Sequence, residues 1–148
     1  PRYKHILGIV GNHDWITDIS VESAWLDESF WRKRFSNLRL LLSEEVNVMG
    51  LRIFGSSWKG SMSHSSPHGF GVIPDNLDVL ISHGPPWGIL DWCGSQHWGS
   101  SDELLADVKA KAPKAHLFGH DHEQRGQWKR DNMEESWRGG GGDMGKPA

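Results

Sequence analysis

Two histidines separated by one residue, His120 and His122, directly follow an apolar run over residues 115–118. Neutral imidazole is a common protein ligand for Zn, Fe and Cu ions. In extended backbone, residues two apart point the same way, so both rings would face one site, and Gly119 permits a sharp turn where the strand ends. The pattern suggests a metal site, although taken alone it is also compatible with ordinary loop histidines.

Two other apolar runs also end in side chains that can bind metal. Residues 6–10 lead into Gly11-Asn12-His13-Asp14, and residues 77–81 lead into Ser82-His83-Gly84-Pro85-Pro86. Both runs are typical of strands, and the first is predicted to be a central strand buried on both faces. Ligands of open α/β sheets bind beyond the carboxyl ends of the strands. We therefore predict that the three strand ends bring together five side chains: Asn12, His13, His83, His120 and His122.

The residues between the first two strand ends predict the elements that support them. Apolar side chains recur at i,i+4 over residues 21–35, which predicts an amphipathic helix. Three short apolar runs over residues 38–54, with Gly50 as a turn, predict strands of a meander. Residues 56–71 are rich in Ser, Gly and His and predict a loop. Histidines without a supporting strand are predicted not to bind metal, namely His64, His68 and His97.

A second helix is predicted between the last two strands. Residues 100–103 have the spacing of a capping box, residues 104–108 provide one apolar face, and Pro113 marks the end. Strand, helix and strand then form a βαβ unit, whose two parallel strands end at the same edge of the sheet. His83 and His120 should therefore be neighbours.

The overall composition restricts the class of protein. A chain of 148 residues is long enough for one domain, which we expect over residues 1–128, followed by a disordered Gly-rich tail over residues 129–148. With a net charge of -3 and no basic stripe, no nucleic-acid partner is evident, and no apolar stretch approaches the roughly 18 residues of a membrane span. Cys93 is the only cysteine, which favours a reducing, cytoplasmic location. No pattern specifies an oligomer.

The three strand-end motifs together resemble the calcineurin-like metallophosphoesterases, and within them the metallophosphoesterase-domain-containing group. The resemblance rests on Gly-Asn-His-Asp, Ser-His-Gly-Pro-Pro and Gly-His-x-His in this order, each after an apolar run, and it covers residues 4–126. Two stretches between these motifs are also similar to that group: Leu51-Arg-Ile-Phe-Gly55 and His83-Gly-Pro-Pro-Trp-Gly-Ile-Leu-Asp-Trp92.

The resemblance implies a fold, cofactors and roles for the matched residues. The fold would be α/β, a truncated four-layer αββα metallophosphoesterase sandwich, with two divalent metal ions (Mn, Fe or Zn) at the sheet ends. Asn12, His83 and His120 would bind the second ion, and His122 would complete the first. His13 would act in catalysis by assisting the leaving oxygen, and Asn12 and His13 would contact the substrate. That substrate would be a small phosphoester, either a phosphodiester or a nucleotide.

One departure from the family pattern keeps other interpretations open. The family begins with an Asp-x-His motif and a Gly-Asp motif, and neither occurs before Gly11. We therefore expect the carboxyl-terminal part of such an enzyme, and a truncated gene model and a complete protein both stay open. The alternative function is a catalytically inactive fragment that retains at most one metal site. A structural zinc module is a poorer interpretation, because such sites usually need several cysteines.

Overall fold

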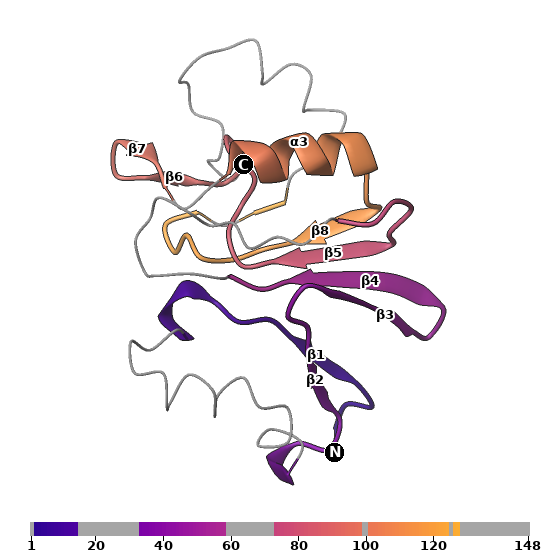
Figure 1. The fold of residues 1–148 in the computed structure, drawn as a ribbon. Helices are drawn as coiled ribbons and strands as arrows, with labels where there is room; N and C mark the ends of the chain where they lie inside the picture. Colours follow the sequence, from indigo (N-terminus) through magenta and orange to yellow (C-terminus); the bar gives the residue numbers. More distant parts are fainter. Residues whose placement is uncertain (1, 15–32, 59–72, 99–100, 125, 128–148) are drawn as a thin grey trace.

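The computed structural model describes residues 2–14, 33–58, 73–98, 101–124 and 126–127. These residues form an α/β fold in three layers: a two-stranded sheet, a four-stranded sheet and a helix, α3, on the far side (Figure 1). The elements are β1 (Ile6–Gly8), η1 (Asn12–Asp14), β2 (Leu38–Leu40), β3 (Glu44–Val48), β4 (Leu51–Ser56), β5 (Val79–Ser82), β6 (Trp92–Cys93), β7 (Gln96–His97), α3 (Asp102–Lys111) and β8 (Ala115–Leu117). The predicted α/β class is confirmed, and the layers are consistent with part of a metallophosphoesterase sandwich.

The four-stranded sheet has the strand order β3-β4-β5-β8. Strands β3 and β4 form an antiparallel hairpin, while β5 runs parallel to both β4 and β8. The hairpin turns at Met49 and Gly50, whose φ angles of 54° and 82° suit a two-residue turn of this kind. The predicted turn at Gly50 is confirmed, but the meander is wrong, because β2 pairs with β1 instead of β3.

The predicted βαβ unit is present as β5, α3 and β8. Helix α3 begins after Ser101, whose hydroxyl accepts a hydrogen bond from the Leu104 N–H at 3.1 Å. It ends at Ala112, which has φ 50° and donates its N–H to Val108 O. The apolar face of the helix packs on the sheet in one cluster of buried residues: Phe54, Ile73, Leu77, Leu80, Leu104 and Val108. Parallel β5 and β8 therefore end side by side.

Strand β1 is not the central strand that its composition predicted. Among the described strands it pairs only with β2, and Ile6 is 37% exposed. The run is apolar because one face lies against the four-stranded sheet, where Leu7 and Ile9 pack beside Val46 and Ile53. A strand with one deeply packed face and a short length cannot be distinguished by its composition from a strand buried on both faces.

The two sheets approach each other closely at Gly55. A Cβ atom at this position would lie 2.3 Å from the Cβ of Leu41, the fully buried residue that follows β2. Only glycine permits this approach. The two-stranded sheet is therefore packed tightly against the end of β4.

Several sequence predictions lie wholly or mostly outside the described residues. They concern the helix over residues 21–35, of which only Lys33 and Arg34 are described as helical, the loop with His64 and His68, and the tail over residues 129–148. Sequence reasoning missed the β6–β7 hairpin, because two-residue strands carry no periodic signal. No helix in the described part of the chain has the length and apolar character needed to cross a bilayer.

Candidate metal centre

Three of the five predicted side chains meet where β1, β5 and β8 end. His83 Nε2 lies 2.8 Å from Asn12 Oδ1 and 3.0 Å from His120 Nδ1. The two imidazole rings meet nearly edge to face, with centroids 4.8 Å apart. One amide oxygen and two imidazole nitrogens, all able to bind a cation, therefore share one small volume.

Asn12 reaches this position through a tight turn after β1. The turn continues into the short helix η1, and the Asp14 carboxylate accepts a hydrogen bond from the Gly11 N–H at 2.7 Å. Asn12 itself is 3% exposed. Asp14 is thus engaged in holding the turn that delivers the Asn12 amide to the centre.

His83 is held by the loop that follows β5. The buried Ser82 hydroxyl donates to Gly84 O at 2.8 Å, and the Gly119 N–H donates to His83 O at 3.0 Å, which ties the ends of β5 and β8 together. On the other side, a Cβ atom at Gly11 would lie 2.6 Å from Cε1 of the His83 ring. The ring therefore occupies space that only a glycine at position 11 leaves open.

His120 adopts a backbone conformation that residues other than glycine rarely take. Its φ is 76°, and Asp121 N donates to Gly119 O at 3.0 Å across it, which makes His120 the centre of a strained three-residue turn. Strain of this kind costs about 1–3 kcal/mol and concentrates at functional sites. The turn aims the His120 ring back toward His83.

Trp58 covers both histidines, and sequence reasoning did not identify it. Its ring centroid lies 5.2 Å from that of His120, at 32°, and 5.5 Å from that of His83, at 87°. Trp58 is only 1% exposed. Trp58 lies just beyond the carboxyl end of β4, as the other site residues do beyond their strands, but a Trp is no metal ligand and so carried no such signal in the sequence.

The other two predicted site residues are not brought into this group. The side chain of His13 lies outside the described part of the structure. His122 is exposed, and no described hydrogen bond or ring contact joins it to the other three. Within the described residues, no three His, Cys, Asp or Glu side chains gather closely enough to hold a metal. The centre therefore consists of two histidines and one amide.

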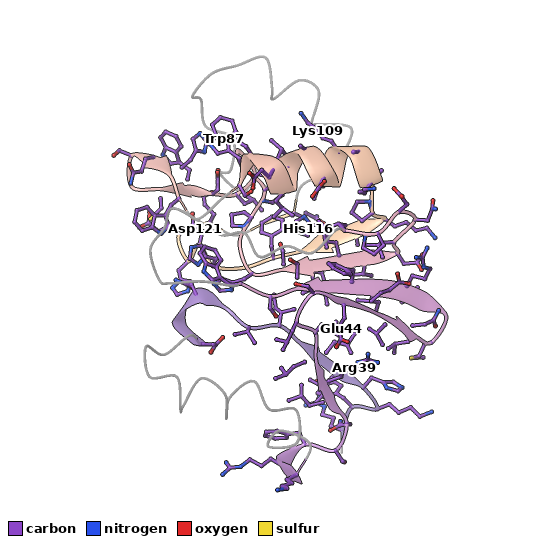
Figure 2. The ribbon with its side chains drawn as sticks, viewed as in Figure 1. Arg39, Glu44, Trp87, Lys109, His116 and Asp121 are labelled. Carbon is purple, nitrogen blue, oxygen red and sulfur yellow. The ribbon has the colours of Figure 1, made fainter. Side chains whose placement is uncertain are left out.

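His97, predicted not to bind metal, has a different environment. Its Nδ1 lies 2.9 Å from Oδ1 of Asp91, a carboxylate that is 2% exposed, and its ring stacks on Trp87 with centroids 4.3 Å apart. The β6–β7 hairpin that carries it is tied to the loop after His120, because Gln124 donates to Trp92 O at 2.9 Å. Figure 2 shows Trp87 beside this hairpin and Asp121 on the loop.

One more histidine, His116, is a half-buried structural residue on β8, the strand that leads to His120 (Figure 2). Because the Ser82 hydroxyl already donates to Gly84 O, it accepts from His116 Nε2 at 2.7 Å, so the proton of the neutral ring is on Nε2. Burial penalises the charged ring and lowers the pKa of His116 from 6.5 to about 4. His116 therefore stays neutral near pH 7.

The donor atoms of the centre fit a divalent ion. Adjacent ligands in an octahedral site lie about 3 Å apart when each is about 2.1 Å from the ion. The observed separations of 2.8 Å and 3.0 Å around His83 Nε2 agree with that spacing. Imidazole nitrogen with amide oxygen suits Zn, Fe and Mn better than a soft ion that needs thiolate. Asn12, His83 and His120 are thus suited to hold one such ion.

Comparisons with known proteins identify several relatives of this chain. No family model matches it. It is 30% identical to metallophosphoesterase domain-containing protein 1 of Homo sapiens over 151 residues, which cover 84% of this chain and 46% of that protein. The Mus musculus protein of the same name gives the same values. UPF0046 protein K07C11.7 of Caenorhabditis elegans is 35% identical over 99 residues, which cover 62% of this chain and 34% of the relative.

These similarities support a metallophosphoesterase family for the chain, and members of that family generally use divalent metal ions. The chain spans about half the length of the first two relatives.

Proposed function

We propose that this chain is a metallophosphoesterase-type domain that uses divalent metal to hydrolyse a small phosphoester. The observation that carries the proposal is the approach of Asn12 Oδ1 and His120 Nδ1 to His83 Nε2, at 2.8 Å and 3.0 Å. Similarity to proteins named for a metallophosphoesterase domain supports it. The site lies beyond the carboxyl ends of β5 and β8, which is where α/β sheets bind ligands.

The proposed roles follow from the chemistry of each side chain. Asn12, His83 and His120 hold one divalent ion, Mn, Fe or Zn, and His122 contributes to a second. When bound, such ions supply positive charge that lowers the pKa of water and neutralises the phosphate. His13, from the Gly-Asn-His-Asp motif, assists the leaving oxygen as a proton donor, and Asn12 and His13 contact the substrate.

A titration and an assay on the same samples test this proposal. Calorimetry with Mn²⁺ should show saturable binding to the wild-type chain and its loss in His83→Ala. Hydrolysis of bis-p-nitrophenyl phosphate should depend on Mn²⁺ and fall in both His13→Ala and His83→Ala. The two variants should differ, since His13→Ala should retain the ion. Wild-type chain that binds no Mn²⁺, Zn²⁺ or Fe²⁺ would overturn the proposal.

A second candidate function is supported by the ligand count. The described residues contain no group of three His, Cys, Asp or Glu side chains that could hold a metal, and a dinuclear centre usually needs carboxylates as well as histidines. In this alternative the chain binds one ion at most and is catalytically inactive. One bound Mn²⁺ per chain without detectable hydrolysis would favour it over the enzyme.

A further inference from the structure

The candidate centre lies across the junction of two separate sheets. Asn12 follows β1 of the two-stranded sheet, whereas His83 follows β5 and His120 follows β8 of the four-stranded sheet. Among the described strands, no backbone pairing joins one sheet to the other. The separation of Asn12 from the two histidines therefore depends on contacts that hold the ends of the sheets together.

One buried hydroxyl makes two of these contacts. Ser57 directly follows β4 and is fully buried. Its Oγ accepts a hydrogen bond from the Val10 N–H at 2.9 Å and donates to Leu41 O at 2.6 Å. Val10 lies between β1 and Asn12, and Leu41 directly follows β2. Ser57 therefore connects the ends of both strands of the smaller sheet to the end of β4.

The next residue, Trp58, contacts the other half of the centre. Its N–H donates to Val10 O at 2.8 Å, so both backbone polar groups of Val10 are bound by adjacent residues. Its buried ring lies against His83 and His120, with the centroid distances given above. A large rigid ring in this position restricts how far either imidazole can rotate.

We propose that Ser57 and Trp58 form a positioning pair that assembles the metal centre across the two sheets. Ser57 holds the strand end that carries Asn12, and Trp58 holds the two histidines. This inference rests on the proposed metal site. An ion bound across the junction must stabilise the packed arrangement of the sheets, and by reciprocity the pair that favours this arrangement must raise the affinity for the ion.

The chain contains a matched control for Ser57. Ser56 is its neighbour and is equally buried, but its hydroxyl has no hydrogen-bond partner among the described residues. Mn²⁺ affinity, measured by calorimetry on the full chain, should fall about tenfold in Ser57→Ala, the effect typical of residues that support metal ligands. In Ser56→Ala, the Mn²⁺ affinity should change less than about twofold. In Ser57→Thr, which keeps the hydroxyl, the Mn²⁺ affinity should return most of the way to the wild-type value.

A second measurement separates positioning from general destabilisation. In the wild-type chain, Mn²⁺ should slow amide hydrogen exchange in β1 and β2, which contribute Asn12 but neither histidine. This protection should be absent or much reduced in Ser57→Ala. If Ser57 were important only for stability, its loss would speed exchange equally with and without Mn²⁺, and the Mn²⁺-dependent protection would survive.

Trp58→Phe provides an independent variant in case Ser57→Ala does not fold. It keeps the backbone bond to Val10 but shortens the ring that contacts His83 and His120. Mn²⁺ affinity should fall several-fold, and the absorption spectrum of bound Co²⁺ should change, since that spectrum reports ligand geometry.

The outcomes separate this inference from the function on which it rests. Wild-type chain that takes up no Mn²⁺ overturns the proposed function and this inference with it. Wild-type chain that binds Mn²⁺ with the same affinity as Ser57→Ala or Trp58→Phe, whichever folds, overturns the inference alone.

Discussion

The two ends of the four-stranded sheet have opposite chemistry. At the amino ends of the parallel strands β4, β5 and β8, charges are paired: Arg52 Nε lies 2.8 Å from Glu45 Oε1, and Lys114 Nζ lies 2.6 Å from Asp78 Oδ1. The hydrogen bond from Lys114 and that from the Arg52 N–H lower the pKa of Asp78. Every charge in this group has a partner of opposite sign, so this end needs no ligand.

The carboxyl ends bring one amide oxygen, of Asn12, and one imidazole nitrogen, of His120, within 3.0 Å of His83 Nε2. They also include a strained backbone at His120 and a ring pressed against Gly11. The backbone conformation of His120 costs folding free energy. Strain at one end of a sheet, with ion pairs at the other, is expected where a bound ligand offsets the strain. This contrast supports the site proposed at the carboxyl end.

The largest effect that would test this difference comes from His83→Ala. Because His83 Nε2 lies at the middle of the three donor atoms, its removal should weaken Mn²⁺ binding more than about a hundredfold, beyond the effect of losing a supporting residue. The matched histidine variants His64→Ala and His68→Ala should bind Mn²⁺ within about twofold of wild type. Calorimetry with Mn²⁺ on all three variants tests this expectation. Equal losses of Mn²⁺ affinity in the three would contradict the assignment of His83 as a ligand.

A pH titration of stability should isolate His116 from the centre. Folding lowers its pKa from 6.5 to about 4, so between these pH values the unfolded chain binds a proton that the folded chain excludes. The free energy of unfolding should therefore fall as the pH drops from 6.5 to about 4, by up to about 3 kcal/mol at about 1.4 kcal/mol per pH unit.

His116→Gln is the control for that titration, because the amide can still donate to the Ser82 hydroxyl but cannot take up a proton. Urea unfolding at several pH values should show a flatter dependence for this variant than for wild type. Parallel curves for the two chains would mean that the proton is taken up elsewhere.

Gly11→Ala should disturb the carboxyl end without removing any ligand atom. The added Cβ would lie 2.6 Å from His83 Cε1, so the ring must leave its observed position in the centre. Mn²⁺ affinity should fall about tenfold, as for other changes that displace a metal ligand. Gly88→Ala controls for backbone strain alone, since its φ of 78° disfavours alanine but a Cβ there meets nothing within 4 Å, so its Mn²⁺ affinity should match that of wild type. If Gly11→Ala binds Mn²⁺ as wild type does, the ring is not confined as described.

The smallest effect is expected at the amino end. Arg52→Ala removes the exposed ion pair with Glu45 and two exposed hydrogen bonds, to Asp75 O and Asn76 O, and should lower the melting temperature modestly, less so in 1 M salt, which screens surface charges. Its Mn²⁺ affinity should match that of wild type. A clear loss of Mn²⁺ binding in this variant would mean that the two ends of the sheet are coupled, and would remove the distinction between them.

Local sequence patterns determined much of the fold around the centre. The capping residues and apolar spacing before β8 predicted helix α3, and the turn at Gly50 predicted the β3–β4 hairpin, because both elements depend on neighbours a few residues away. The apolar runs that end in polar residues identified Asn12, His83 and His120 as candidates, since the end of a strand can be recognised without knowing its partner.

Tertiary structure decided which strands pair and which candidates meet. The composition of β1 did not show that its apolar face packs on another sheet, since one buried face and two give similar short runs. The roles of Ser57 and Trp58 were equally hidden, because a Ser and a Trp after a strand carry no signal until Val10, 47 residues from Ser57, arrives beside them. His122 shares the motif of His120 but stays exposed, because the strained turn at His120 redirects the chain.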